Sequence, residues 1–161
     1  KKSYFTNKTE QQWYLGDTYN MSIGQGFLLA TPVEVANAFV GLVNNGKFLE
    51  PHLLKKEAVV SNQLEGIALE NYDIVKRGMR QCVTNGSCTR LHNLPFTSAA
   101  KTGTAQIISK ADIYDNWVAV FAPYENPEIV LVVLLENVQG VRVAAQTVAE
   151  QILYWYLVEN K

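Results

Sequence analysis

Apolar residues recur at helical spacing in the first part of the chain and form strand-like runs after about residue 98. The first helical stripe predicts a helix that begins at Pro32. Its apolar face consists of Val35, Phe39, Leu42 and Val43. A second helix is predicted from Tyr72 to about Thr84. Its apolar face consists of Val75, Met79, Cys82 and Val83. Residues 47–70 show neither period and are predicted to form an irregular connection.

The two ends of the first helix are marked by local signals. Thr31 is an N-cap residue, Pro32 occupies the first helical position, where no N–H is needed, and Glu34 is placed to complete a capping box. Residues 44–46, Asn-Asn-Gly, end the helix because glycine readily adopts the left-handed conformation found at helix ends. We therefore expect the helix to stop just before residue 44.

Three strands are predicted in the second part of the chain, over residues 99–108, 116–122 and 128–136. Residues 123–127, Pro-Tyr-Glu-Asn-Pro, have the composition of a turn, so the last two strands are expected to form an antiparallel hairpin. The last strand is apolar at consecutive positions, which means that both of its faces require cover.

A closing helix is predicted over about residues 142–158. The face that it is expected to lay on the sheet consists of Ala144, Val148, Ile152 and Trp155. The other helices must then shield the opposite face of the sheet. These elements predict an α/β fold of the α+β type, in which an antiparallel sheet is flanked by helices.

Composition and charge narrow the possible functions. A chain of 161 residues with 48% hydrophobic residues fits one domain with a real core. The 14 basic and 15 acidic residues give a net charge of -1, and no run of Lys or Arg indicates a nucleic-acid partner. The longest apolar run, Ile129 to Leu135, is far shorter than the roughly 20 residues that cross a bilayer. The first residues also lack the pattern of a signal peptide.

Two cysteines and two histidines are the remaining residues with distinctive chemistry. Cys82 and Cys88 are separated by a turn-like segment that could close into a disulfide. Alternatively, Cys82 is a core thiol on a helix face and Cys88 a loop residue. His52 and His92 lie forty residues apart without ligand spacing, so no metal site and no other cofactor is predicted.

The strongest candidate for a binding strand is Lys101-Thr102-Gly103-Thr104, within the predicted strand 99–108. It offers an ammonium group, two hydroxyls and a glycine that allows another backbone to approach closely. A peptide that ends in a carboxylate could pair with such a strand as an additional strand. Lys-Thr-Gly by itself is short and occurs by chance in many proteins, so its sequence context decides its meaning.

Several other stretches stand in a characteristic order around this motif. They are WYLGDT (13–18), SIGQG (22–26), TPVE (31–34), VNNG (43–46) and PHLL (51–54), then KTGTAQ (101–106) and NWVAVFAPYENPEIVLVVLLEN (116–137). This order resembles the C-terminal half of the transpeptidase domain of class B penicillin-binding proteins, and most of all the cell-elongation type, penicillin-binding protein 2. The resemblance implies an incomplete fold of the penicillin-binding transpeptidase or serine beta-lactamase kind. Residues 1–161 would then be the C-terminal portion of one transpeptidase domain.

The resemblance also implies roles for the four residues of the motif. Lys101 would bind the terminal carboxylate of the substrate and tune proton transfer at the nucleophile. Thr102 and Thr104 would offer hydroxyls to that carboxylate, and Gly103 would keep the approach open. The backbone N–H of Thr104 would be one of two oxyanion donors. Lys101 and Thr104 are thus the expected catalytic residues, and residues 101–104 the expected substrate-binding set.

The nucleophile of the family is missing from the matched residues. The family carries Ser-x-x-Lys on a helix and Ser-x-Asn on a loop; no serine here fits the second pattern, and only Ser98 with Lys101 fits the first. Along a strand, residues three apart point to opposite faces, so Lys101 cannot serve there as the base for Ser98. We therefore expect the catalytic serine to lie upstream of Lys1.

The implied function is that of part of a peptidoglycan D,D-transpeptidase, which cross-links stem peptides ending in D-Ala-D-Ala through a serine acyl-enzyme and is acylated by beta-lactams. The implied partners are the upstream part of the domain, a glycan polymerase and other elongation proteins. The implied location is the outer face of the bacterial cytoplasmic membrane, with an anchor outside this chain. Two alternatives stay open: part of a serine beta-lactamase or D,D-carboxypeptidase, which share the Lys-Thr-Gly strand, and a non-catalytic penicillin-binding or sensor module.

Overall fold

The structure is a computed structural model that describes residues 12–54, 60–108, 112–140 and 143–160. The chain divides into two compact units, residues 1–31 and residues 32–161. The described part of the first unit contains helix α2, Leu15–Ser22. The Asp17 carboxylate accepts a hydrogen bond of 2.8 Å from the backbone N–H of Tyr14 and so caps the start of this helix. Beyond the helix, Gly24 and Gly26 adopt positive φ angles of 73° and 70°.

Helix α3 of the second unit confirms the predicted boundaries, since it spans Pro32–Val43. Asn45 and Gly46 follow with positive φ angles of 54° and 90°. The connection after it was predicted to be irregular, and this prediction was wrong in part. Two short strands, β1 (Lys47–Leu49) and β2 (Ser61–Gln63), pair there in antiparallel fashion.

Helix α4 spans Leu69–Thr84 and therefore begins three residues earlier than predicted. Met79 and Val83 are buried as expected, but Val75 is 48% exposed, so its assignment to the core face was wrong. The buried stripe runs instead through Tyr72, Met79 and Val83, which places Val75 beyond the edge of the stripe. A short 3-10 helix, η1 (Thr89–Asn93), follows.

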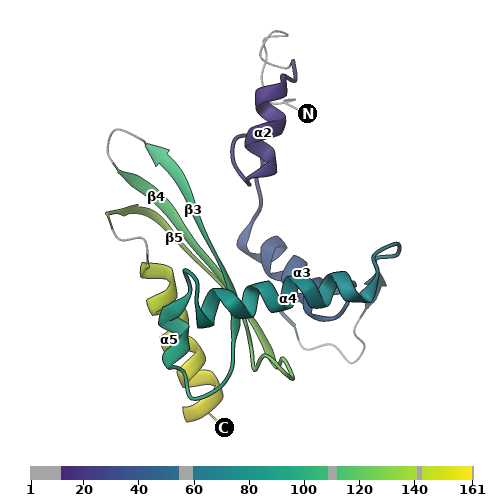
Figure 1. Ribbon diagram of the computed structural model, residues 1–161, viewed down its shortest axis with the longest axis vertical. Coiled ribbons are helices and arrows are strands. Elements are labelled where there is room, and N and C mark those ends of the chain that lie inside the picture. Colours follow the sequence, from purple (N-terminus) through teal and green to yellow (C-terminus); the bar gives the residue numbers. More distant parts are fainter. Residues whose placement is uncertain (1–11, 55–59, 109–111, 141–142, 161) are drawn as a thin grey trace. The chain divides into compact units, whose positions relative to one another are not determined.

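The sheet of the second unit has three antiparallel strands in the order β3-β4-β5 (Figure 1). Strand β3 spans Ala99–Ile108, β4 Ile113–Ala122 and β5 Ile129–Gln139. The predicted hairpin between the last two strands is confirmed, with Ala122 opposite Ile129. Strand β3 lies at an edge of this sheet, because within the described residues it pairs with β4 alone.

Helix α5, Ala144–Tyr154, packs against β4 and β5, and a π-helical turn, η3 (Trp155–Glu159), extends it. The face predicted to meet the sheet was wrong in part. Val148 packs against the apolar core as expected, but the fully buried stripe is shifted by one position. Ile152 and Trp155 are 38% and 52% exposed. The residues that are buried are Ala145, Gln146, Ala149, Leu153 and Leu157. Small side chains on this stripe let the helix lie close to the sheet. The side-chain oxygen of Asn116 in β4 accepts a hydrogen bond of 2.9 Å from Ala145 N–H. This bond fixes the rotation of the helix about its axis.

Two apolar clusters cover the two faces of the sheet. One joins the face that carries Ala100, Val118 and Val120 to helix α5. The other joins the face that carries Ala99 and Phe121 to Met79 of α4 and to side chains of α3. Helices therefore lie on both sides of the sheet, which confirms the predicted α+β architecture (Figure 1). Among the described helices, none has the length and apolar character that a bilayer crossing requires.

Candidate functional site

The predicted binding segment is extended and lies in the middle of the edge strand β3. Lys101 is opposite Ala119 of β4, and Gly103 is opposite Trp117. Because successive side chains of a strand point to opposite faces, Lys101 and Gly103 share the face that packs on α3 and α4. Thr102 and Thr104 lie on the face that packs on α5.

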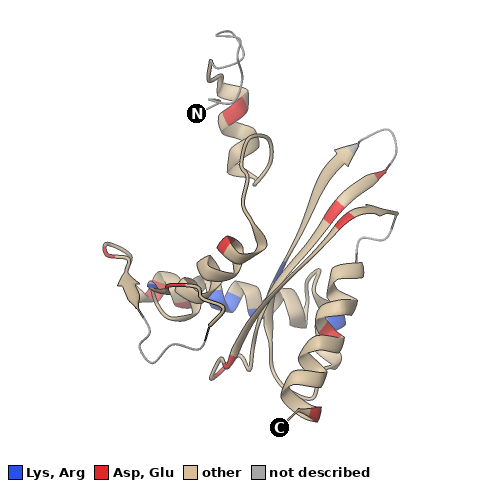
Figure 2. Cartoon of the chain, turned by 180° about the vertical axis from the view of Figure 1, so that it is seen from behind, with Lys and Arg blue, Asp and Glu red and all other residues tan. Residues whose placement is uncertain are grey.

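Lys101 has an exposed side chain on this edge strand. Its Nζ donates a hydrogen bond of 2.6 Å to the carbonyl oxygen of Thr102, so the ammonium stays next to its own strand. Within β3, β4 and β5, all of which lie in the described part of the chain, Lys101 is the single basic residue. Figure 2 accordingly shows basic colouring of the sheet on β3, and acidic segments on β4 and β5. The strand thus presents the one basic side chain of the three strands at the edge of the sheet.

Gly103 leaves room over the neighbouring strand. A Cβ atom at this position would lie 3.3 Å from Cβ and 3.9 Å from Cγ of Trp117. The first distance is tighter than an ordinary van der Waals contact, so a side chain here would press against Trp117. Glycine therefore keeps this face of the edge strand flat, between the lysine and the indole.

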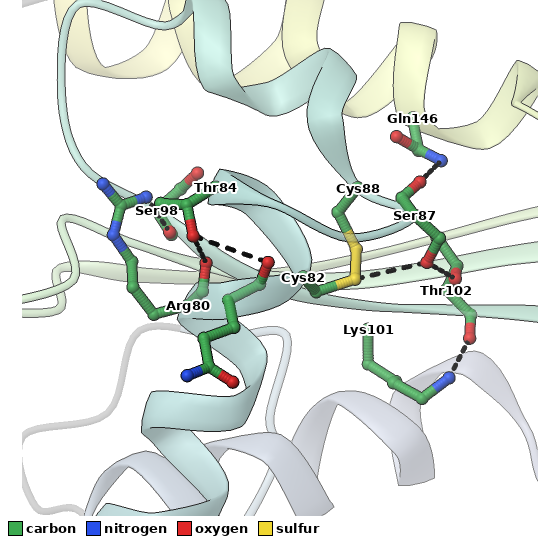
Figure 3. Close-up of a disulfide and its surroundings, with 10 residues drawn as sticks. Arg80, Cys82, Thr84, Ser87, Cys88, Ser98, Lys101, Thr102 and Gln146 are labelled. Atoms are coloured by element: carbon green, nitrogen blue, oxygen red, sulfur yellow. Dashed lines mark hydrogen bonds between the residues drawn. A yellow bond between two sulfur atoms is a disulfide. The ribbon is translucent and has the colours of Figure 1, made fainter.

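The side chain of Thr102 contacts the segment between α4 and η1 (Figure 3). Its Oγ1 lies 2.8 Å from Oγ of Ser87, which follows helix α4. The carbonyl oxygen of Ser87 accepts a hydrogen bond of 2.8 Å from Nε2 of Gln146 in α5. We did not predict either Ser87 or Gln146 as a site residue; the one signal in the sequence was the position of Ser87 between the two cysteines.

A disulfide closes the turn that carries Ser87. Cys82 and Cys88 are bonded, with their Cα atoms 5.0 Å apart, which resolves the two alternatives in favour of the disulfide. Cys88 is completely buried, and its backbone N–H donates a hydrogen bond of 2.9 Å to the carbonyl oxygen of Cys82. The turn between α4 and η1 is thus tied both covalently and through its backbone.

The start of β3 is attached to helix α4 and to the β4–β5 turn. Nη1 of Arg80 donates a hydrogen bond of 2.8 Å to the carbonyl oxygen of Ser98, and its guanidinium lies 6.0 Å from the ring centroid of Tyr124. Tyr124 N–H donates to both the carbonyl oxygen and Oγ1 of Thr97, each at 3.1 Å. These contacts hold the first residues of β3 in register with the turn.

Ser98 itself is completely buried. Its Oγ has no hydrogen-bond partner among the described residues. It directly precedes β3, which begins at Ala99. A hydroxyl without solvent access and without a base in contact is unsuited to attack a substrate, which agrees with the reasoning that excluded Ser98 as the nucleophile.

Glu125 lies in the β4–β5 turn, and its pKa is lowered by the groups around it. The Thr97 hydroxyl donates a hydrogen bond to its carboxylate, and this bond is the main cause that lowers the pKa of Glu125 below its ordinary value of 4.5. A bond from its own backbone and the charge of Arg80 lower the pKa further, while partial desolvation opposes them. The ionised carboxylate therefore helps to hold Thr97 in place.

Metal ligands do not gather in the described part of the chain: no three His, Cys, Asp or Glu side chains come together there as a possible site. His52 contacts the backbone carbonyl oxygen of Leu54 through Nδ1 at 2.6 Å. The edge strand itself offers the ammonium group of Lys101 and the hydroxyls of Thr102 and Thr104.

Comparisons with known proteins agree on one family. Residues 2–154 match the family described as "Penicillin binding protein transpeptidase domain". The chain is 34% identical over 181 residues to peptidoglycan D,D-transpeptidase MrdA of Haemophilus influenzae, in an alignment that covers 92% of this chain and 27% of that protein. The chain thus spans about a quarter of the length of the curated relatives that it matches.

Two solved structures of penicillin-binding protein 2 are similar to this chain. The Pseudomonas aeruginosa protein in complex with WCK 5153 has a TM-score of 0.76 and 32% identity, over 94% of this chain and 36% of that chain. The Helicobacter pylori protein, in its complex with MreC, has a TM-score of 0.79 and 27% identity, over 96% of this chain and 30% of that chain.

Proposed function

Because this chain belongs to the transpeptidase domain family of penicillin-binding proteins, we propose that it forms part of a peptidoglycan D,D-transpeptidase. The resemblance read from the ordered motifs is confirmed at the level of the family, and the relatives named MrdA and penicillin-binding protein 2 support the elongation type. The single observation that carries the proposal is the edge strand β3, which carries Lys101-Thr102-Gly103-Thr104 and, within the described residues, pairs with β4 alone.

An edge strand suits a peptide substrate because the peptide can pair with its backbone as one more strand. A peptide in that position lies in the plane of the sheet, so side chains from both faces of β3 flank it. Lys101 would approach its terminal carboxylate from one face, and the hydroxyls of Thr102 and Thr104 from the other. The small size of Gly103 leaves the substrate backbone free to lie close.

The proposed reaction is acyl transfer in two steps. A serine hydroxyl attacks the carbonyl carbon between the last two D-alanines; the terminal D-alanine leaves with a proton on its amine, and the stem peptide becomes an ester of the serine. The amine of a second stem peptide then attacks this ester, forms the cross-link and returns the proton to the serine. The N–H of Thr104 would donate to the carbonyl oxygen as negative charge develops on it.

The serine in this scheme comes from outside residues 1–161. Ser98 is buried, and the sequence contains no other Ser-x-x-Lys pattern. We propose that the upstream portion of the same domain supplies the serine, its lysine and the second oxyanion donor, and that residues 1–161 form the C-terminal portion of that domain. The face of β3 that carries Lys101 would then be one wall of a site completed by that portion.

The test uses the full-length parent protein and a fluorescent penicillin. A stable covalent adduct supports a transpeptidase, rapid hydrolysis of the adduct indicates a beta-lactamase or D,D-carboxypeptidase, and no adduct indicates a non-catalytic module. Lys101→Ala should slow acylation by about 10- to 100-fold, the effect of one charge-assisted contact. Lys47→Ala is the matched control, since Lys47 is also an exposed lysine on a strand and lies outside the proposed site.

The isolated 161 residues should show no labelling at all, because both the nucleophile and one oxyanion donor are proposed to be elsewhere. Loss of one such donor alone slows catalysis by about a hundredfold or more. Covalent labelling of the isolated chain would contradict this assignment directly. Equal labelling of the parent and its Lys101→Ala variant would contradict the role of the edge strand.

The partners and location follow from the same proposal. The expected ligands are stem peptides that end in D-Ala-D-Ala, and beta-lactams. The Helicobacter pylori relative forms a complex with MreC, which supports a protein partner of that kind for the parent. We further propose a glycan polymerase and other elongation proteins as partners. We place the parent protein on the outer face of the bacterial cytoplasmic membrane, anchored by a segment outside this chain. Fractionation of cells that express the tagged parent checks the location.

A further inference from the structure

We propose that Ser87 is a positioning residue that orients the Thr102 hydroxyl toward the carboxylate of the substrate. This inference rests on the proposed function, because Thr102 is assigned to substrate binding there. It assigns a role to a turn that is distant in sequence from β3 and that carries none of the family motifs recognised in the chain. The turn consists of residues 85–88, between α4 and η1.

The distance between the two hydroxyls fixes the starting point. Ser87 Oγ and Thr102 Oγ1 lie 2.8 Å apart, the usual separation of two hydroxyl oxygens that share a hydrogen bond. Threonine is β-branched and has few χ1 rotamers, so one hydrogen bond to Oγ1 selects the direction in which its hydroxyl can act. Ser87 is thus the group that sets the Thr102 rotamer in this structure (Figure 3).

The direction of the hydrogen bonds follows from what each group can donate. A hydroxyl has one proton to donate and two lone pairs to accept with. If Thr102 is to donate its proton to a substrate carboxylate, Ser87 must donate to Thr102. The chain Ser87 O–H to Thr102 O–H to carboxylate is then aligned, and each bond polarises the next. Cys82 Sγ lies 3.3 Å from Ser87 Oγ and, in the disulfide, can only accept. Sulfur is a weak acceptor, so the Thr102 oxygen at 2.8 Å is the better acceptor for the Ser87 proton.

The turn is rigid enough to act as a fixed support. The disulfide joins Cys88, the last residue of the turn, to Cys82 in the last turn of α4. Gly86 packs so closely on the end of α4 that a Cβ there would lie 2.8 Å from Cα of Cys82. Gln146 of α5, which is 97% buried, donates to the carbonyl oxygen of Ser87 from the other side. Ser87 is therefore held through its backbone, while its hydroxyl points to the motif strand.

The experiment measures acylation of the full-length parent by benzylpenicillin in stopped-flow or quench mode. Ser87→Ala should lower the second-order acylation rate constant by about fivefold, the effect of one neutral hydrogen bond. Ser87→Thr, which keeps the hydroxyl at an exposed position, should restore the rate to within about twofold of the wild type. Thr89→Ala is the matched control, because it removes another exposed hydroxyl two residues further along and should leave the rate unchanged.

Two further measurements separate positioning from general damage to the fold. The Ser87→Ala effect should disappear when benzylpenicillin methyl ester replaces the acid, because the ester lacks the carboxylate that Thr102 is proposed to bind. The double variant with Thr102→Ala should react no more slowly than Thr102→Ala alone.

Equal losses with the acid and the ester, or additive losses in the double variant, would overturn the inference. So would an unchanged rate in Ser87→Ala when the wild type is acylated normally. If the wild-type parent is not acylated at all, it is instead the proposed function that fails. The two outcomes are therefore distinguishable in the same set of measurements.

Discussion

The disulfide between Cys82 and Cys88 offers a quantitative test of how the turn behind β3 is stabilised. Reducing it leaves the sequence and the packed volume of both cysteines in place, so the change is confined to the covalent link. In the loop-entropy description, a link between residues six apart lowers the conformational entropy of the open form by about 7 cal/mol/K. This raises the free energy of the open form by about 2 kcal/mol at 25 °C. Local opening of the turn should become easier by up to that amount.

Hydrogen–deuterium exchange of the full-length parent measures this opening directly. The informative amides are those of Cys88 and Leu91, whose N–H groups donate to the carbonyl oxygens of Cys82 and Cys88 at 2.9 Å and 3.1 Å. A loss of about 2 kcal/mol corresponds to exchange that is about 30-fold faster. The amide of Leu64, which donates to Gly46 in the β1–β2 region, should exchange at the same rate in both states.

The double variant Cys82→Ala and Cys88→Ala is the control, since reductant should not change its exchange. Thiol titration confirms that two thiols have formed in the reduced wild type. Unchanged exchange at Cys88 and Leu91 under those conditions would refute the reasoning, because the backbone contacts and Gln146 alone would then hold the turn. An equal acceleration at Leu64 would show instead that reduction loosens the whole unit.

The remaining predictions concern the strand and its surroundings. Gly103→Ala adds a methyl group 3.3 Å from Trp117 Cβ on the proposed substrate side. The free energy of unfolding, measured by thermal unfolding, should change by no more than about 1 kcal/mol, whereas acylation by penicillin should slow. An unaltered acylation rate would argue against substrate contact at that position. Phe121→Ala removes a completely buried ring and should lower the free energy of unfolding by about 3–5 kcal/mol in denaturant titration, whereas a loss below about 1 kcal/mol would show that the cluster repacks. Since the pKa of Glu125 is lowered in the folded state, its contribution to stability is present above pH 4.5 and is lost as the pH falls through the folded pKa. In the Glu125→Gln variant, the melting temperature should therefore depend less on pH below 4.5 than it does in the wild type. The same pH dependence in both proteins would contradict the bond to Thr97.

Elements with local signals were predicted well from the sequence. Helix α3 begins at Pro32 and ends before Asn44 as its capping residues indicated, and β3 has the expected bounds. The pair β1–β2 could not be predicted in the same way. Ser61–Gln63 is polar and entirely exposed, so it has no alternation to detect, and β1 is placed by the packing of Phe48 on Gly41.

The rotation of α5 and the support of Thr102 depend on contacts between distant residues. The helical period in the sequence does not distinguish between two neighbouring faces of the helix. In the structure the face with Ala145 packs on the sheet, because its side chains are small and because Asn116 of β4 accepts a hydrogen bond from Ala145 N–H. Ser87 meets Thr102 because α4 ends beside β3, a fact of tertiary structure. The motif strand could therefore be found from the sequence, whereas its supporting residues could not.

The double attachment of Tyr124 N–H to Thr97 has a consequence for the evolution of this region. It fixes the point at which the chain enters β3, and from there each residue alternates between the two faces of the sheet. Insertion or deletion of one residue between Thr97 and Lys101 would place the Lys101 side chain on the face of the sheet that packs on α5. It would place the Thr102 side chain on the face that packs on α3 and α4. Length between residues 97 and 101 should therefore be invariant among functional descendants, even where the identities of those residues drift.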